Sequence, residues 1–328
     1  MSRRLLPRRR VGIVDRASTP EGRDVTVPLA YLNGRLIPQV EATLAIHDAG
    51  IVYGATVTDY CRTFGRRLYL WPDHLGRLRR DCTTCFIPLL PSDEELTRQA
   101  EELVEHNARL LPAGEELALV TFATPGPLGA LVGAPGQDGP PTLVMHTLPL
   151  DRGRYRRFFT EGVALAAIGQ YDPDPDGLTP PNVKHRSRLH WWRAERFLST
   201  HRGMPAGALA MPLTSRGCIT ETAIGTVLVV IDGAVFAPPD GTVLAGISLR
   251  VVDELCGELG IELIESELLL EELQEAKEAM LCGTAFCLAG VSRVEGVQLP
   301  WPGPVTRRLL AAWGERVGVD IAEWFTRP

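Results

Sequence analysis

Helix-like and strand-like segments are mixed along this 328-residue chain. Short runs in which every second residue is apolar predict strands, and longer runs with apolar residues three and four apart predict helices. Both kinds occur throughout, without the strict alternation of strand and helix that a doubly wound sheet requires. The pattern predicts a mixed α/β (α+β) fold, and the length is sufficient for two domains or one large one.

Some elements are marked by their end residues. The pair Asn33-Gly34 predicts a hairpin turn within Leu29–Leu36. An amphipathic helix is predicted over Ser92–Leu110, with Ser92 as its cap and Glu95 at the capping-box position. We also expect Asp73 to cap a helix.

Three further segments bear on the organisation of the chain. The run Glu271–Leu281 has a helical pattern. Residues 148–157 are short, polar and basic, and are the candidate interdomain linker. Residues 1–27 are predicted to be an N-terminal extension, which is basic but lacks the apolar core of a signal peptide.

The composition limits the partners and the compartment. The net charge of −6 gives no general case for nucleic-acid binding, and no apolar run is long enough to cross a membrane. The seven cysteines are irregularly spaced, which favours a reducing cytoplasm over a disulfide framework. Cys82 and Cys85 have CxxC spacing, but without a second pair they predict neither a redox nor a metal site.

Lysine is almost absent from the chain. Of 34 lysines and arginines, only Lys184 and Lys277 are lysine. An amine can lose its proton and attack a carbonyl, whereas a guanidinium cannot. Lys277 lies in the helix-like run with Glu275 and Glu278 nearby, whereas no acidic residue is three or four positions from Lys184. Lys184 is therefore the candidate for a Schiff base, and the alternative is a surface lysine.

Three segments offer groups that bind phosphate. Gly246 precedes a predicted helix with Ser248 at its start, and the free N–H groups and dipole of a helix N-terminus favour an anion. Thr284 brings a hydroxyl next to Gly283, and Arg77 can fork two phosphate oxygens. The alternatives are an ordinary capped helix, a buried turn and a surface arginine.

Glu221 is a further candidate site residue. Glu221 precedes a strongly apolar strand, where it is either solvated or paired with a cation. A pyridinium nitrogen needs such an anionic partner to stay protonated and let the ring act as an electron sink. Lys184, Glu221 and the phosphate-type segments are together the parts that pyridoxal 5′-phosphate requires.

The order of these segments resembles that of the class IV (fold-type IV) pyridoxal-phosphate aminotransferases, which include the branched-chain and D-amino-acid aminotransferases. The resemblance covers about Tyr31 to Val291. The segments that carry it are Leu32–Gly34, Asp48–Gly54, His74–Leu78, Val183-Lys184, Ile219–Glu221, Leu244–Arg250 and Gly283–Ala285. None is specific alone, but seven in the same order identify the family.

The resemblance implies a two-domain fold with the cofactor in the interdomain cleft, and it implies homodimers. A smaller N-terminal α/β domain would span 28–147 and a larger cofactor-binding domain 158–328. Lys184 would form the aldimine and shuttle the substrate proton, and Glu221 would bind the pyridine nitrogen. The groups implied to hold the phosphate are Arg77, the Ile247 and Ser248 amides, the Ser248 hydroxyl and Thr284. The Thr284-Ala285 backbone would lie near the substrate carboxylate.

The chain departs from the family where substrates bind. Thr58 stands where the family has an aromatic residue, and Pro125 where D-amino-acid aminotransferases have an arginine that clamps a substrate carboxylate. His185, Arg186 and Arg188 make the neighbourhood of the lysine basic, which favours an acidic or bulky polar substrate. Together with the Thr284-Ala285 backbone, these positions give the candidate substrate-binding residues, which are Thr58, Thr284, Ala285 and Arg188.

The function that the resemblance implies is transamination between an amino acid (or amine) and a 2-oxo acid, with pyridoxal 5′-phosphate as cofactor. Two alternatives stay open at this point. One is a lyase of the aminodeoxychorismate lyase type, and the other is a degenerate protein that binds the cofactor without turnover.

Overall fold

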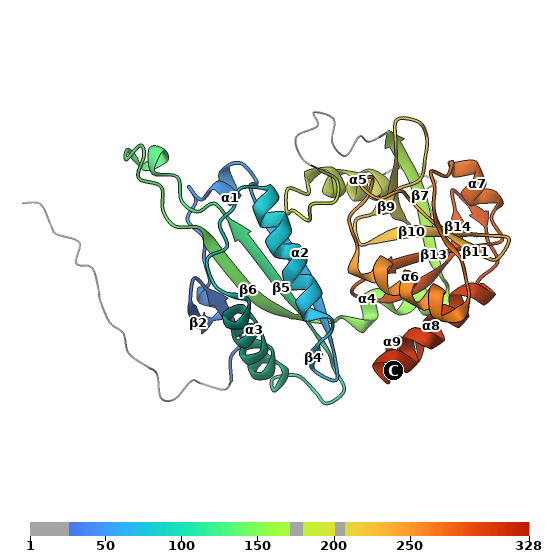
Figure 1. Ribbon diagram of the computed structural model, residues 1–328, viewed down its shortest axis with the longest axis horizontal. Coiled ribbons are helices and arrows are strands. Elements are labelled where there is room, and N and C mark those ends of the chain that lie inside the picture. Colours follow the sequence, from blue (N-terminus) through green and yellow to red (C-terminus); the bar gives the residue numbers. More distant parts are fainter. Residues whose placement is uncertain (1–25, 171–179, 201–206, 328) are drawn as a thin grey trace, which may run out of the picture.

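The computed structural model describes residues 26–170, 180–200 and 207–327, and they form two lobes, each built on its own sheet (Figure 1). Strands β1–β6 and helices α1–α3 make the first lobe, and β7–β15 with α4–α9 make the second. The predicted N-terminal extension lies almost wholly outside the described residues. The mixed α/β class is confirmed.

The first sheet is antiparallel, with the strand order β2-β1-β6-β5-β3-β4 in the described residues. Its strands are β1 (Leu29–Leu32), β2 (Arg35–Pro38), β3 (Val57–Phe64), β4 (Arg67–Leu68), β5 (Leu117–Thr124) and β6 (Thr142–Pro149). The predicted hairpin is β1–β2, and Asn33 and Gly34 in its turn have positive φ angles of 48° and 89°. Asparagine and glycine tolerate this left-handed geometry, so these two residues were sufficient to predict the hairpin.

Two long helices cover one face of this sheet. They are α2 (Trp71–Thr84) and α3 (Asp93–Ala108), and their apolar residues share a core with β1, β3, β5 and β6. The predicted cap of α3 is confirmed, because Ser92 Oγ accepts the Glu95 N–H at 3.2 Å. The predicted cap at Asp73 is wrong. Helix α2 begins at Trp71, and Asp73 in its first turn accepts a hydrogen bond from Arg250 of the second lobe at 2.7 Å.

The second sheet is mixed. Its main path is β12-β11-β10-β13-β14-β7-β8, with β9 on β10 and β15 on β14. The strands are β7 (Val163–Gln170), β8 (Leu209–Leu213), β9 (Glu221–Thr222), β10 (Gly225–Ile231), β11 (Ala234–Ala237), β12 (Leu263–Glu265), β13 (Glu278–Gly283), β14 (Cys287–Val294) and β15 (Val297–Gln298). The β-branched run in β10 is buried at the centre, as expected for a strand covered on both faces.

Helices pack around this second sheet. They are α4 (Arg152–Thr160), α5 (Leu189–Thr200), α6 (Ile247–Leu259), α7 (Leu270–Glu275), α8 (Pro304–Val317) and α9 (Ile321–Thr326). Helices α6 and α8 pack on each other and on β13, whereas α5 packs on β8 through a separate small core. The short helices α1 (Ala49–Val52), η1 (Gln39–Glu41) and η2 (Gly129–Val132) belong to the first lobe.

The helix predicted over Glu271–Leu281 is wrong in its second half. Helix α7 ends at Glu275, and the chain continues as β13, whose residues are all buried between β10 and β14. Pairing on both sides outweighs the local helical preference. Lys277 lies exposed between α7 and β13, so its explanation as a helix residue is wrong as well.

The segment between the lobes is mostly regular. Of the predicted linker 148–157, the first two residues end β6 and the last six lie in α4. Among the described helices, none is long and apolar enough to span a bilayer.

Candidate active site

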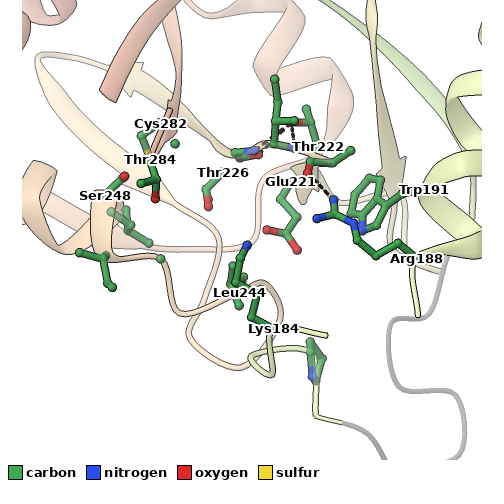
Figure 2. A pocket seen from close by; sticks show the side chains of 18 of the residues that line it. Lys184, Arg188, Trp191, Glu221, Thr222, Thr226, Leu244, Ser248, Cys282 and Thr284 are labelled. Carbon is green, nitrogen blue, oxygen red and sulfur yellow. Dashed lines mark hydrogen bonds between the residues drawn. The ribbon is translucent and has the colours of Figure 1, made fainter. Parts of the chain in front are cut away.

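An open cavity of about 130 Å³ lies where α2 of the first lobe meets β9, β13 and α6 of the second. Seven of the predicted site residues line it: Arg77, Lys184, Arg188, Glu221, Ile247, Ser248 and Thr284. Figure 2 shows the hydroxyls of Ser248, Thr284 and Thr226 at one end, Arg188 and Trp191 at the other, and Lys184 with Glu221 between them. We call these the hydroxyl end and the arginine end.

Lys184 belongs by sequence to the second half of the chain, but its backbone is bound to the first lobe. Its N–H donates to the Asp81 carboxylate of α2 at 3.0 Å, and its carbonyl accepts the Thr58 N–H of β3 at 2.8 Å. Val183 packs into the core of the first lobe, and His185 forms a β-bridge with Val57. These contacts hold the lysine backbone at both polar groups while its side chain enters the cavity.

The side chain of Lys184 points toward the Glu221 carboxylate (Figure 2). Burial lowers the pKa of the Lys184 amine, and the nearby charges of Arg77 and Arg188 lower it further, whereas Asp59 and Glu221 act in the opposite direction. Burial likewise raises the pKa of Glu221, against the effect of Lys184. Both groups are thus shifted toward their neutral forms, which gives Lys184 a free amine at lower pH than an exposed lysine.

Arg77 reaches the cavity from α2 and is 4% exposed. Its Nε and Nη2 donate to one oxygen of Asp59, at 2.9 and 2.7 Å, and the other oxygen of Asp59 lies 2.6 Å from His74 Nδ1. Burial alone would raise the pKa of Asp59, but Arg77 and His74 outweigh it and hold the pKa far below the ordinary value. Asp59 is therefore ionised and fixes the guanidinium in one orientation.

The hydroxyl end suits a phosphate. Helix α6 begins at Ile247, and its N-cap is Gly246, which has no side chain to occupy the first N–H groups. Ser248 and Thr284 line the same end of the cavity with hydroxyls. A free helix N-terminus, two hydroxyls and the nearby Arg77 supply the donors and the positive potential that a phosphate monoester requires.

Gly283 allows Thr284 to lie here. A Cβ on Gly283 would lie 2.3 Å from the Ile224 carbonyl oxygen, so only glycine permits this approach of β13 to the β9–β10 turn. Glycine at 225 is similarly required, because a Cβ there would lie 2.4 Å from the Cys282 carbonyl oxygen.

The arginine end has a different character. Arg188 Nη2 donates to the Ala223 carbonyl, and no carboxylate of the described residues forms an ion pair with Arg188. His185, His190 and Trp191 line the cavity beside it. Burial lowers the pKa of His190 to about 4, with smaller effects from His185 and Arg188, so this imidazole is neutral near pH 7.

Two predicted substrate residues do not line the cavity. Thr58 is 6% exposed and its hydroxyl donates to the Thr121 carbonyl at 2.9 Å, although its backbone holds Lys184. Ala285 is buried behind Thr284, and its carbonyl accepts from Arg62 at 2.9 Å.

Sequence reasoning missed the two carboxylates that organise the site, Asp59 and Asp81. Asp81 lies four residues after Arg77, on the same face of α2, and helical spacing would have revealed it. Asp59 could not be found in that way, because its partners His74 and Arg77 lie on another element.

A buried lysine amine faces a carboxylate beside a phosphate-type helix N-terminus, at the junction of the two lobes. This arrangement is the one expected of a fold-type IV pyridoxal-phosphate enzyme. Comparison with known proteins carries the assignment further.

The class IV amino-transferase family model matches residues 56–294, so the chain belongs to the class IV aminotransferases. It is 25% identical over 283 residues to a putative branched-chain-amino-acid aminotransferase of Methanocaldococcus jannaschii, covering 85% of this chain and 93% of that protein. It is 24% identical over 289 residues to a D-alanine aminotransferase of Listeria monocytogenes, with coverages of 85% and 92%.

A solved structure agrees in fold. The branched-chain aminotransferase of Thermoproteus uzoniensis, solved with norvaline, superposes with a TM-score of 0.75 at 22% identity, covering 88% of this chain and 94% of that one. The chain is a transaminase, and the cofactor of its family is pyridoxal 5′-phosphate. The comparisons do not favour the lyase or the degenerate binding protein.

Proposed function

We propose that Lys184 is the catalytic residue of a transamination between an amino donor and a 2-oxo acid. The observation that carries this proposal is a lysine amine of lowered pKa that faces Glu221 inside the cavity. Bound pyridoxal phosphate supplies an electron sink for the α-carbon of the substrate. The Lys184 amine would hold the cofactor at its carbonyl carbon, and as a free amine it would move the proton at the α-carbon of the substrate.

The other residues hold the cofactor in our proposal. Glu221 binds the pyridine nitrogen and keeps it protonated. Arg77, the Ile247 and Ser248 amides, the Ser248 hydroxyl and Thr284 bind the phosphate. Asp59 and Asp81 act as positioning residues, Asp59 on the Arg77 guanidinium and Asp81 on the Lys184 backbone.

Reductive trapping tests the central assignment. Borohydride treatment of the loaded protein should attach a pyridoxyl group to Lys184, which peptide mass spectrometry locates. Lys277 is the internal control, because it lies exposed outside the cavity. Label on Lys277, or equal labelling of a Lys184→Ala protein, would refute the assignment.

For the substrate, we propose an amino donor or acceptor with an acidic or bulky polar side chain at the arginine end. The support is Arg188, which forms no ion pair with a carboxylate among the described residues although Glu221 acts on it through space, and the neighbouring His185. Branched-chain amino acids and D-alanine, named for the two relatives, are the competing donors. A single-turnover screen of L- and D-amino acids and amines, following the cofactor spectrum, discriminates between them. Aspartate and glutamate reacting no faster than valine or alanine would contradict the proposal.

We further propose a homodimer. The loops 45–53 and 126–133 of the first lobe are joined by backbone hydrogen bonds, and they expose Ile51, Tyr53 and Leu131 by 55% or more. Adjacent exposed apolar residues of this kind favour a protein interface. Light scattering should give the mass of two chains, and Tyr53→Asp with Leu131→Asp should reduce it to one.

The domain boundaries and the compartment are proposals as well. The two sheets, each with its own core, support domains at 28–147 and 158–328. Seven free cysteines support a reducing compartment, the cytoplasm.

A further inference from the structure

Arg62 is a buried cation outside the cavity that the proposed chemistry does not use. It lies on β3 with 2% of its surface exposed. Its Nη1 donates to the Ala285 carbonyl at 2.9 Å and lies 3.5 Å from Cys287 Sγ, and its guanidinium carbon is 3.9 Å from the centre of the Phe64 ring. The side chain therefore joins the first lobe to the turn between β13 and β14.

Among the described residues, no ion pair neutralises the charge of Arg62. Within the described residues, no carboxylate lies within 4 Å of its guanidinium. Glu116 lines a small cavity beside it, but the Glu116 oxygens accept from Thr63, Gly65 and Arg66. A buried charge without a counter-ion is costly, so a fixed anion nearby would be favoured.

The position of Arg62 indicates which anion. A small cavity of about 10 Å³ behind the phosphate-type site is lined by Arg62, Tyr69, His74, Ser248, Thr284 and Trp313. Arg62 thus adjoins the first turn of α6, the turn that holds Thr284, and the helix that carries Arg77. Arg77 is itself neutralised by Asp59, which leaves Arg62 as a net positive charge next to these elements.

We propose that Arg62 is a positioning residue for the cofactor phosphate. Its bond to the Ala285 carbonyl fixes the turn that presents Thr284, and its unpaired charge attracts the phosphate dianion. The proposal rests on the proposed function, which assigns the phosphate to Arg77, Ser248 and Thr284.

Inorganic phosphate tests the proposal without catalysis. Full-length protein freed of cofactor should show a higher melting temperature in phosphate than in chloride at equal ionic strength. Arg62→Met should abolish most of this increase and weaken the binding of pyridoxal 5′-phosphate at least about tenfold, which corresponds to about 1.4 kcal/mol. Arg62→Lys keeps the charge but not the planar fork, so we expect an intermediate loss. Binding of pyridoxal, which lacks the phosphate, should change much less.

Two variants calibrate the result. Arg67→Met, on exposed β4 of the same hairpin, should behave like the parent protein, and Arg77→Met should lose the phosphate effect. If Arg62→Met and Arg62→Lys fold and keep the full phosphate effect while Arg77→Met loses it, the role of Arg62 is wrong and the proposed site stands. If phosphate does not stabilise the parent protein either, the proposed site itself is wrong. Equal loss of pyridoxal and pyridoxal phosphate binding would make Arg62 merely structural and overturn the proposal.

Discussion

The two ends of the cavity differ in how they are built. The hydroxyl end is formed by the first turn of α6 and by the β13–β14 turn, and Gly225 and Gly283 have no room for a Cβ. The arginine end is formed by residues 180–188 and the start of α5, and Arg188 contacts a backbone carbonyl. Hydrogen-bond donors on regular elements are held rigidly, which suits a group such as a phosphate that is the same for every substrate. A long side chain with a single contact can adapt, which suits the variable part of a substrate.

The largest expected effect concerns Lys184, which lies between the two ends. Lys184→Ala removes the amine that we propose both binds the cofactor and acts as the base. We expect a loss of at least about 100- to 10,000-fold in the half-reaction, the usual size of the proton-transfer contribution alone. Stopped-flow spectra with a saturating donor measure the rate. Because the hydroxyl end is intact in this variant, phosphate should still raise its melting temperature. Loss of that increase would show that the hydroxyl end depends on the Lys184 side chain.

Glu221→Gln is expected to have the next largest effect. The amide cannot stabilise a protonated pyridine nitrogen, so the half-reaction should slow by about tenfold or more while the cofactor stays bound. Removing the Glu221 charge also removes one influence that raises the pKa of Lys184, so this pKa should fall further. Turnover at the parental rate would show that Glu221 does not bind the nitrogen. Glu262→Gln, at a glutamate that does not line the cavity, is the control.

Asp81→Ala tests whether the position of Lys184 depends on the hydrogen bond from its backbone N–H to Asp81. The Lys184 N–H would lose its acceptor, at a cost of about 1–3 kcal/mol for a group held away from water. We expect a lower melting temperature and a reduced kcat with little change in phosphate stabilisation. Thr83→Ala, on an exposed position of the same helix, is the matched control. A variant with parental kcat would show that the other contacts of the segment, among them the Thr58 hydrogen bond, hold it without Asp81.

Arg188→Leu is expected to have the smallest effect and is the most specific test of the arginine end. Burial lowers the Lys184 pKa most, followed by Arg77 and then Arg188. Removing Arg188 should therefore raise this pKa slightly, and the pH midpoint for cofactor attachment should move upward. If acidic substrates bind here, KM for glutamate or aspartate should rise more than KM for alanine. Arg193→Leu, on the exposed side of α5, is the control and should change neither the pH midpoint nor the KM values. If Arg188→Leu changes KM by the same factor for every donor, Arg188 does not select the substrate.

Much of the fold could be predicted because its signals are local. Asn33-Gly34 determined its hairpin through its own backbone preferences, and Ser92 determined the start of α3. The Glu271–Leu281 segment could not be predicted in this way. Its second half is a strand because β10 and β14 lie on either side of it, and only the folded sheet supplies those partners.

The sequence by itself identified the candidate reactive groups. The scarcity of lysine, the order of the motifs and the glycine before α6 were enough to name Lys184, Glu221 and Ser248. Only the tertiary structure decided their environment. Lys184 is bound to Asp81 and Thr58 of the other lobe, Thr58 contributes its backbone and not its side chain, and Arg77 is paired with Asp59. Burial and charge act through space, so the pKa of a residue depends on neighbours that are far away along the chain.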